Sequence, residues 1–127
     1  MTRTEAFDKA WRLVFKGDFS LFDEIYHPDF KGINPIVGDV ELNFDAFKEG
    51  VHTLKDFIIF TPSKILAEED KFLKVRRYNK LKEADVFSLV TVSITYKDGK
   101  IINQQYLVEE LDHDPSEGQD WNWEDYE

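Results

Sequence analysis

The sequence predicts an α+β domain with three helices in its N-terminal half and an antiparallel sheet after them. Before Thr61-Pro62, apolar side chains recur at the three- and four-residue spacing of amphipathic helices. After it, long runs rich in β-branched and aromatic residues are separated by short turns. Helices followed by strands are typical of an α+β domain. The 127 residues are enough for one domain with its own core.

The first helix is predicted over residues 4–16, with Thr4 as its N-cap and Gly17 as its C-terminal stop. Its apolar positions follow helical spacing: Phe7, Ala10, Trp11, Val14 and Phe15. Asp18 caps a second, short helix, and Pro28 ends it. We therefore expect a pair of helices before the first strand.

The first strand is predicted over Phe30–Ile36, with a turn after it at Val37-Gly38-Asp39. Asn43 then opens a third helix. The apolar positions of this helix are Phe44, Phe47, Val51, Leu54 and Ile58. The helix ends at Thr61-Pro62, because proline lacks an N–H group and restricts the residue before it.

The rest of the domain reads as four antiparallel strands. Their predicted ranges are Ser63–Glu68, Lys71–Lys80, Asp85–Lys97 and Ile101–Leu111. Asp98-Gly99 stands between the last two, and this dipeptide is a strong signal for a tight β-hairpin turn. The sheet is therefore predicted to be mainly antiparallel.

The net charge of −10 is concentrated at the C-terminus. We divide the chain into a domain over residues 1–111 and an acidic aromatic tail over residues 112–127. Acidic residues without Lys or Arg run from Glu109 to Glu127, so the rest of the chain is almost neutral. This distribution argues against nucleic acids and anionic membranes as partners, because both are bound by basic surfaces. With no apolar run of membrane-spanning length, we expect a cytoplasmic protein.

A resemblance to a known superfamily is carried by residues 17–38. They read Gly-Asp-Phe-Ser-Leu-Phe-Asp-Glu-Ile-Tyr-His-Pro-Asp-Phe-Lys-Gly-Ile-Asn-Pro-Ile-Val-Gly. This passage from a capped helix into a strand that ends at Asn-Pro resembles the nuclear transport factor 2-like superfamily, which includes SnoaL-like polyketide cyclases and ketosteroid isomerase. The element order extends the resemblance over residues 4–111. It implies a curved sheet wrapped over three helices, a conical pocket between them, and a homodimer formed through the sheet.

The resemblance does not extend to the chemistry of ketosteroid isomerase. That reaction needs a carboxylate base, with a tyrosine and a neutral carboxylic acid as oxyanion donors. The matching positions here are Asn34, Ala10 and Thr91. Because all three functional groups are absent, we do not expect isomerase activity of that type.

The resemblance also implies which strand residues face the pocket. Aligning the Gly99-Lys100 turn with the equivalent isomerase turn places Thr91, Gln104 and Tyr106 toward it. The same alignment turns Lys74, Arg76 and Tyr78 inward. A shift of one residue would exchange them for Val75, Arg77 and Asn79, because neighbouring side chains on a strand face opposite ways.

The predicted ligand-binding set is Asn34, Arg76, Tyr78, Thr91, Gln104 and Tyr106. Arg76 and Tyr78 could hold a ligand carboxylate or enolate. They could equally form a surface ion pair or a dimer contact. Asn34 could bind a ligand carbonyl, or it could simply favour a turn before proline. Gln104 and Tyr106 suit a carbonyl-bearing ligand as well as a water-filled core.

Nucleophilic and metal chemistry have little support in the sequence. There is no cysteine, no phosphate-binding glycine loop and no His pair at metal-ligand spacing. We therefore expect no metal and no cofactor. His52 flanks the apolar stripe of the third helix, at a rim or surface position or as a base.

Three functions remain open from the sequence. The first is a domain that binds a small, mostly apolar, carbonyl-bearing ligand without the isomerase base. The second is a cyclase, isomerase or dehydratase that uses Arg76, Tyr78 and His52. The third is an accessory domain that associates with another protein through its tail. Trp121 and Trp123 are expected either to pack over the pocket mouth or a dimer partner, or to lie in a solvated tail.

Overall fold

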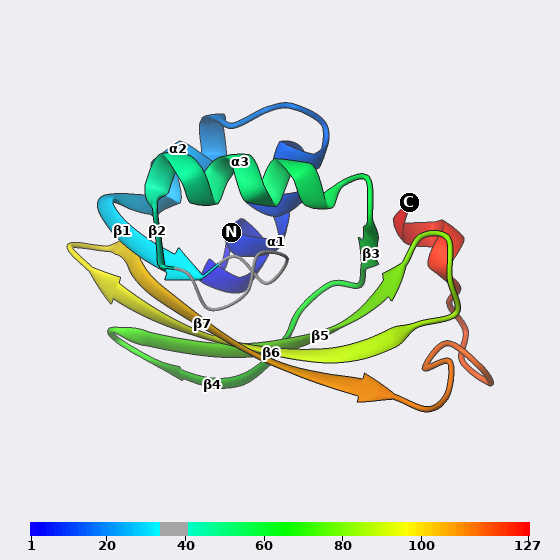
Figure 1. Ribbon diagram of the computed structural model, residues 1–127. Coiled ribbons are helices and arrows are strands. Elements are labelled where there is room, and N and C mark those ends of the chain that lie inside the picture. The colour runs from blue at the N-terminus through cyan, green and yellow to red at the C-terminus, as the bar shows by residue number, and fades with distance from the viewer. Residues whose placement is uncertain (34–40) are drawn as a thin grey trace.

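A computed structural model describes residues 1–33 and 41–127, and within these ranges three α-helices lie against one face of a seven-stranded sheet. The elements are α1 (Arg3–Phe15), α2 (Ser20–Ile25), β1 (Tyr26–Ile33), β2 (Glu41–Asn43), α3 (Phe44–Leu54), β3 (Ile58–Phe60), β4 (Lys64–Glu69), β5 (Phe72–Leu81), β6 (Phe87–Lys97), β7 (Lys100–Leu111) and the 3₁₀-helix η1 (Trp123–Tyr126). Figure 1 shows the sheet curling around the helices. The predicted α+β class, with a curved sheet wrapped over three helices, is confirmed.

The sheet is mainly antiparallel, as predicted. Its strand order is β2-β1-β7-β6-β5-β3, and β4 pairs with the other half of the same β5 edge. Of the strand pairs in the described ranges, β1 with β7 is parallel. The β6–β7 hairpin turns at Asp98-Gly99, where both residues have positive φ (55° and 76°). This geometry is that of the predicted Asp-Gly turn.

The helix caps differ in detail from those predicted. Thr2, rather than Thr4, caps α1, and its hydroxyl accepts a hydrogen bond from the Glu5 N–H in a capping box. Thr4 is instead buried against the sheet side of the helix. Asn43 caps α3 as predicted, accepting a hydrogen bond from the Ala46 N–H.

Two boundaries were predicted wrongly. The third helix ends at Leu54, and Ile58 opens the short strand β3 instead of continuing the helix. All three β3 residues are buried because the helices cover one face and the C-terminal tail covers the other. The first strand begins at Tyr26, so Pro28 lies inside it. The β1–β7 register shifts between Tyr26 and Lys31, and such an irregularity accommodates a proline.

The core lies between the helices and the concave face of the sheet, and aromatic rings dominate it. Trp11 of α1 contacts Phe47 of α3 and Phe60 of β3 edge-on. Tyr26 stacks on Phe22, with ring centroids 4.3 Å apart. Such geometries are favoured by the ring quadrupoles, so they hold the helices in a defined position over the sheet.

The acidic aromatic tail is folded onto its own domain. Trp123 is only 7 % exposed and forms a second apolar cluster with Ile59 and Phe87. Trp121 stacks on Tyr78 of β5. In Figure 1 the C-terminal segment lies beside β3, outside the helix-covered side of the sheet. The expected alternative of a solvated tail is therefore wrong for these tryptophans.

None of the helices in the described ranges combines the length and apolarity that crossing a membrane requires.

Candidate functional site

A cavity of about 310 Å³ lies between the concave face of the sheet, α1 and the end of α3. Most of its wall is apolar, from Trp11, Leu54, Ile58, Val86, Val90 and Val108. The polar residues of its wall come from the strands: Arg77, Asn79, Lys80, Ser88 and Tyr106. A concave apolar wall with a few convergent polar groups is typical of a small-molecule site.

The register of the sheet explains which side chains reach this cavity. Val75 of β5 lies opposite Val92 of β6, which lies opposite Tyr106 of β7. Directly opposed residues share a face, and successive residues alternate. Arg77 and Asn79 therefore follow Val75 on the concave face, while their neighbours project from the convex face.

A chain of hydrogen bonds runs from α1 to the cavity wall. The Trp11 Nε1–H donates to the Tyr26 hydroxyl (3.1 Å), and Tyr26 donates to Gln104 Oε1 (2.5 Å). Gln104 Nε2 then donates to the Tyr106 hydroxyl. The chain leaves the Tyr106 proton without an acceptor among the described residues, so this hydroxyl can donate to a ligand in the cavity.

Burial keeps both phenols of this chain in their neutral, donating form. Burial raises the pKa of Tyr26 well above its ordinary value, and Tyr106 adds to the effect. Burial likewise raises the pKa of Tyr106, against the opposing influence of Arg77. Neither hydroxyl ionises near neutral pH, so each retains the proton that the chain requires.

Arg77 is the most unusual residue of the site. It is only 3 % exposed, and its guanidinium lies over the rings of Trp11 (4.5 Å) and Phe60 (4.7 Å). Its Nε and Nη1 are buried and have no hydrogen-bond partner in the described part of the chain. Burial lowers the pKa of Arg77, but a guanidinium remains charged at neutral pH.

Solved structures share this architecture. The chain resembles an epoxide hydrolase of the LEH-like type from M. tuberculosis, with 15 % identity, a TM-score of 0.60, and 83 % and 80 % of the two chains covered. It resembles the epoxide hydrolase/cyclase-like enzyme SalBIII, which has a role in pyran ring formation in salinomycin, with 19 % identity, a TM-score of 0.64 and coverages of 84 % and 90 %.

A third structure names the fold. It is a nuclear transport factor 2-like protein of unknown function from Cytophaga hutchinsonii, with 9 % identity, a TM-score of 0.65, and 86 % and 91 % of the two chains covered. The chain has the nuclear transport factor 2-like fold. No protein-family model and no curated protein matches the sequence. At these identities the comparisons establish the fold alone.

Two predicted site residues lie on the concave face of the sheet. Tyr106 lines the cavity. Gln104 is fully buried behind it, where it orients the Tyr106 hydroxyl. Contact of either residue with a ligand stays a prediction.

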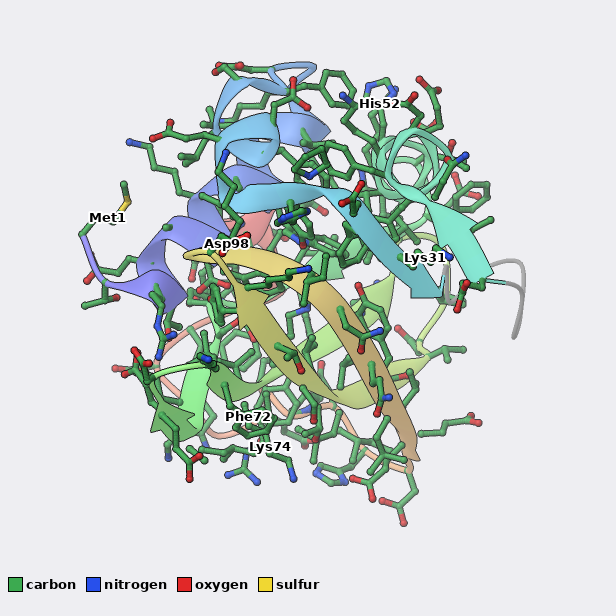
Figure 2. The ribbon with its side chains drawn as sticks, turned by 90° about the vertical axis from the view of Figure 1, so that its left-hand side faces the viewer. Met1, Lys31, His52, Phe72, Lys74 and Asp98 are labelled. Carbon is green, nitrogen blue, oxygen red and sulfur yellow. The ribbon has the colours of Figure 1, made fainter. Side chains whose placement is uncertain are left out.

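Three other predicted site residues are on the convex face, so their predicted orientation is wrong. Arg76 lies opposite Thr91, which lies opposite the exposed Leu107. Tyr78 shares this face and packs against Trp121. Figure 2 shows Lys74, the next residue of this set, on the side of the sheet away from the helices. The one-residue shift described above is the arrangement that occurs, and it brings Val75, Arg77 and Asn79 inward.

The convex-face residues border a separate hollow of about 350 Å³. Arg76 and Tyr78 line it together with the aromatic rings of Trp121 and Tyr126. Arg77 reaches it from the other side of the sheet edge. The tryptophans of the tail therefore do not cover the cone, because no tail residue is part of the cavity wall.

The other sequence candidates do not join the cavity. Asn34 lies outside the described residues. Ala10 is fully buried in the core beside Trp11. His52 is half-buried on α3, with its ring 5.4 Å from that of Phe19, and Figure 2 shows it on the far side of the molecule from Lys74. In the described ranges no group of three His, Cys, Asp or Glu could hold a metal ion.

The largest hollow, about 640 Å³, is a different kind of site. It is an open surface depression beside β3, where Arg12, Lys16, Lys55 and Lys82 face Asp125 and Glu127 of the tail. Basic and acidic side chains thus occur together there, with Asp56 as a third acidic residue of the lining. We regard the smaller cavity as the functional site, because Arg77 Nε and Nη1 and Asn79 Oδ1 of its wall are buried without a hydrogen-bond partner among the described residues.

Proposed function

We propose that the cavity of about 310 Å³ between the sheet, α1 and the end of α3 is a binding cone. Its ligand is a small, mostly apolar molecule with a carbonyl-type oxygen. The observation that carries this proposal is the convergence of Tyr106 and Arg77, both donors, on one largely apolar cavity. Donors without acceptors complement oxygen atoms of a ligand, and the surrounding wall suits an apolar body.

Binding without catalysis is favoured over the enzyme reading. General acid–base chemistry needs a group that can exchange a proton within hydrogen-bond reach of the substrate. The cavity wall formed by the described residues contains no Asp, Glu or His. Arg76, Tyr78 and His52, which the enzyme reading requires, are all outside it.

An enzyme remains the second candidate because two of the similar structures are an epoxide hydrolase and an epoxide hydrolase/cyclase-like enzyme by name. In that case Arg77 and Tyr106 would polarise a substrate oxygen, and the proton acceptor would have to come from outside the described cavity wall. Turnover of an epoxide or a polyketide-like carbonyl compound would favour this candidate.

The cone can be tested by closing its mouth. Val108 lines the cavity and is 52 % exposed, whereas its neighbour Leu107 is 58 % exposed on the opposite face. Val108→Trp should block entry, and Leu107→Trp is the matched control. Using the ketone 4-phenylbutan-2-one as a probe, we expect chemical-shift changes at Val90 and Tyr106 that V108W abolishes and L107W leaves in place.

The proposal fails if the ketone shifts no cavity residue, or if both tryptophan variants bind it as the wild type does.

We also propose that the chain forms a homodimer through the convex face of the sheet. Leu107 is exposed there beside Thr91 and the partly exposed Leu89. Two apolar side chains on neighbouring strands of one exposed sheet face, Leu107 and Leu89, suit association with a second copy.

A further inference from the structure

The guanidinium of Arg77 has no ion-pair partner in the described part of the chain. It is buried, and no Asp or Glu of residues 1–33 and 41–127 forms an ion pair with it. Moving an ion from water into a protein interior costs several kcal/mol, and about that much must be returned by a partner. An Arg side chain in a folded protein is almost never fully buried unless it is paired.

The aromatic contacts offset only part of this cost. A desolvated cation is stabilised by each aromatic ring beneath it, and Arg77 lies over Trp11, Phe60 and Phe7. These contacts leave its Nε and Nη1 without an acceptor among the described residues. Asp8 is the acidic residue that most influences Arg77, but its two carboxylate oxygens already accept hydrogen bonds from the Ser63 N–H (2.7 Å) and hydroxyl (2.6 Å). Among the described residues, Arg77 therefore has Asp8 as a nearby negative charge but no hydrogen-bonded acceptor for its Nε and Nη1.

We propose that the cone binds a monocarboxylate, with the carboxylate on Arg77 and the apolar body along the cavity wall. This inference rests on the proposed function and narrows its ligand class from carbonyl compounds to carboxylic acids. Arg77 is the one fully buried cation of the described cavity wall, since Lys80 is only half-buried and its Nζ donates to the Leu81 carbonyl. One buried cation neutralises one negative charge, which favours a monoanion over a phosphate with a higher charge and more oxygens to satisfy. The Tyr106 hydroxyl lines the same cavity and supplies a further donor for the carboxylate.

The test compares an acid with its neutral isostere. The probes are 3-phenylpropanoate and 3-phenylpropanamide, titrated at pH 7 into ¹⁵N-labelled protein while the Arg77 Nε–H signal and the cavity methyl signals are followed. We expect the acid to bind at least tenfold more tightly than the amide and to shift the Arg77 Nε–H signal. This measurement uses the wild-type chain, so it does not depend on a variant that folds.

Two arginine variants then test which residue causes the preference for the acid over the amide. Arg77→Met removes the charge while keeping an apolar side chain of similar length, and it should abolish the preference for the acid. Arg76→Met removes the same charge from the next position of β5, on the convex face, and should leave the preference unchanged. Val108→Trp should remove the shift of the Arg77 signal by the acid.

The outcomes separate this inference from the proposed function. If the titrations give equal affinities for the acid and the amide, the carboxylate assignment is wrong. The proposal that the cavity binds a small molecule would still hold. If the acid shifts Arg77 equally in V108W, the anion is bound from the convex-face hollow and the inference is overturned. If neither compound shifts any cavity signal, both proposals are overturned.

Discussion

Among single residues, Tyr26 connects the core to the site. Its hydroxyl accepts from Trp11 Nε1 and donates to Gln104 Oε1, and all three side chains are almost fully buried. Because every group in this chain has a partner up to Tyr106, the direction of the last hydroxyl is set by the buried Tyr26 and Gln104 behind the cavity wall. The packing of α1 therefore determines the donor that the cone offers.

Removing this hydroxyl should be costly. Tyr26→Phe leaves the Trp11 Nε1–H and Gln104 Oε1 buried without partners, and each such group costs about 1–3 kcal/mol. We expect the free energy of unfolding, measured with urea, to fall by about 2–4 kcal/mol. Tyr96→Phe is the control, since no hydrogen bond of the Tyr96 hydroxyl is found among the described residues, and its effect should be below about 1 kcal/mol. Equal effects of the two variants would contradict this role for Tyr26.

At the level of secondary structure, the tail and β3 depend on each other. Ile59 of β3 faces away from the helices and is buried by Trp123 of η1. The Trp123 Nε1–H donates to the Asp114 carboxylate (3.0 Å), which also accepts from Ser116. An acidic segment that composition alone would assign to disorder is thus ordered by two tryptophans and one carboxylate.

The tail should stabilise the domain measurably. Trp123→Ala removes a buried indole from the second apolar cluster, and such a change costs about 3–5 kcal/mol. We expect a lower midpoint in thermal unfolding and an unchanged affinity for cavity ligands, because no tail residue lines the cone. Glu124→Ala changes the exposed neighbour and should have little effect. A Trp123→Ala variant as stable as the wild type would show that the tail does not pack as described.

Across the whole molecule, the two faces of the sheet pack against different parts of the chain. The concave face builds the core and the cone, while the convex face carries the tail at one end and exposed side chains along the rest. Figure 1 shows this layering, with the helices on one side of the curled sheet. The proposed dimer uses the part of the convex face that the tail leaves free.

Light scattering coupled to size-exclusion chromatography tests the dimer. Leu107→Glu places a charge in the proposed interface, and burying an unpaired charge there should convert a dimer of about twice the 15.0 kDa chain into a monomer. Ile65→Glu is the control, since Ile65 is exposed on β4 away from β7. A wild-type chain that elutes as a monomer at micromolar concentration would contradict the proposal.

The sequence predicted the elements better than the faces. Helical spacing identified α1 and α3, and the long β-rich runs identified β5 to β7, because these patterns are local. The orientation of β5 was predicted wrongly because both of its faces carry polar side chains that suit a ligand: one carries Arg76 and Tyr78, the other Arg77 and Asn79. Only pairing with β6 decides between them, and that pairing depends on the whole fold.

The residue that matters most for the site had one sequence signal. Leu73, Val75 and Arg77 are every second residue of β5, so their side chains share one face of the strand. The apolar Leu73 and Val75 mark this face as buried, which predicts that Arg77 is buried with them. The packing of the tail had no comparable signal, because its cluster draws on β3, β5 and β6 at once.

We infer that Arg77 is kept for a ligand at the expense of stability. The most direct measurement is the free energy of unfolding of wild type and Arg77→Met, each with and without 3-phenylpropanoate. Without the acid, the variant should be at least as stable as the wild type, by up to about 4 kcal/mol, because replacing a buried charge by an apolar group is often stabilising. The acid should then stabilise the wild type alone. An Arg77→Met variant that is less stable without the acid, together with no gain for the wild type on adding it, would contradict the account.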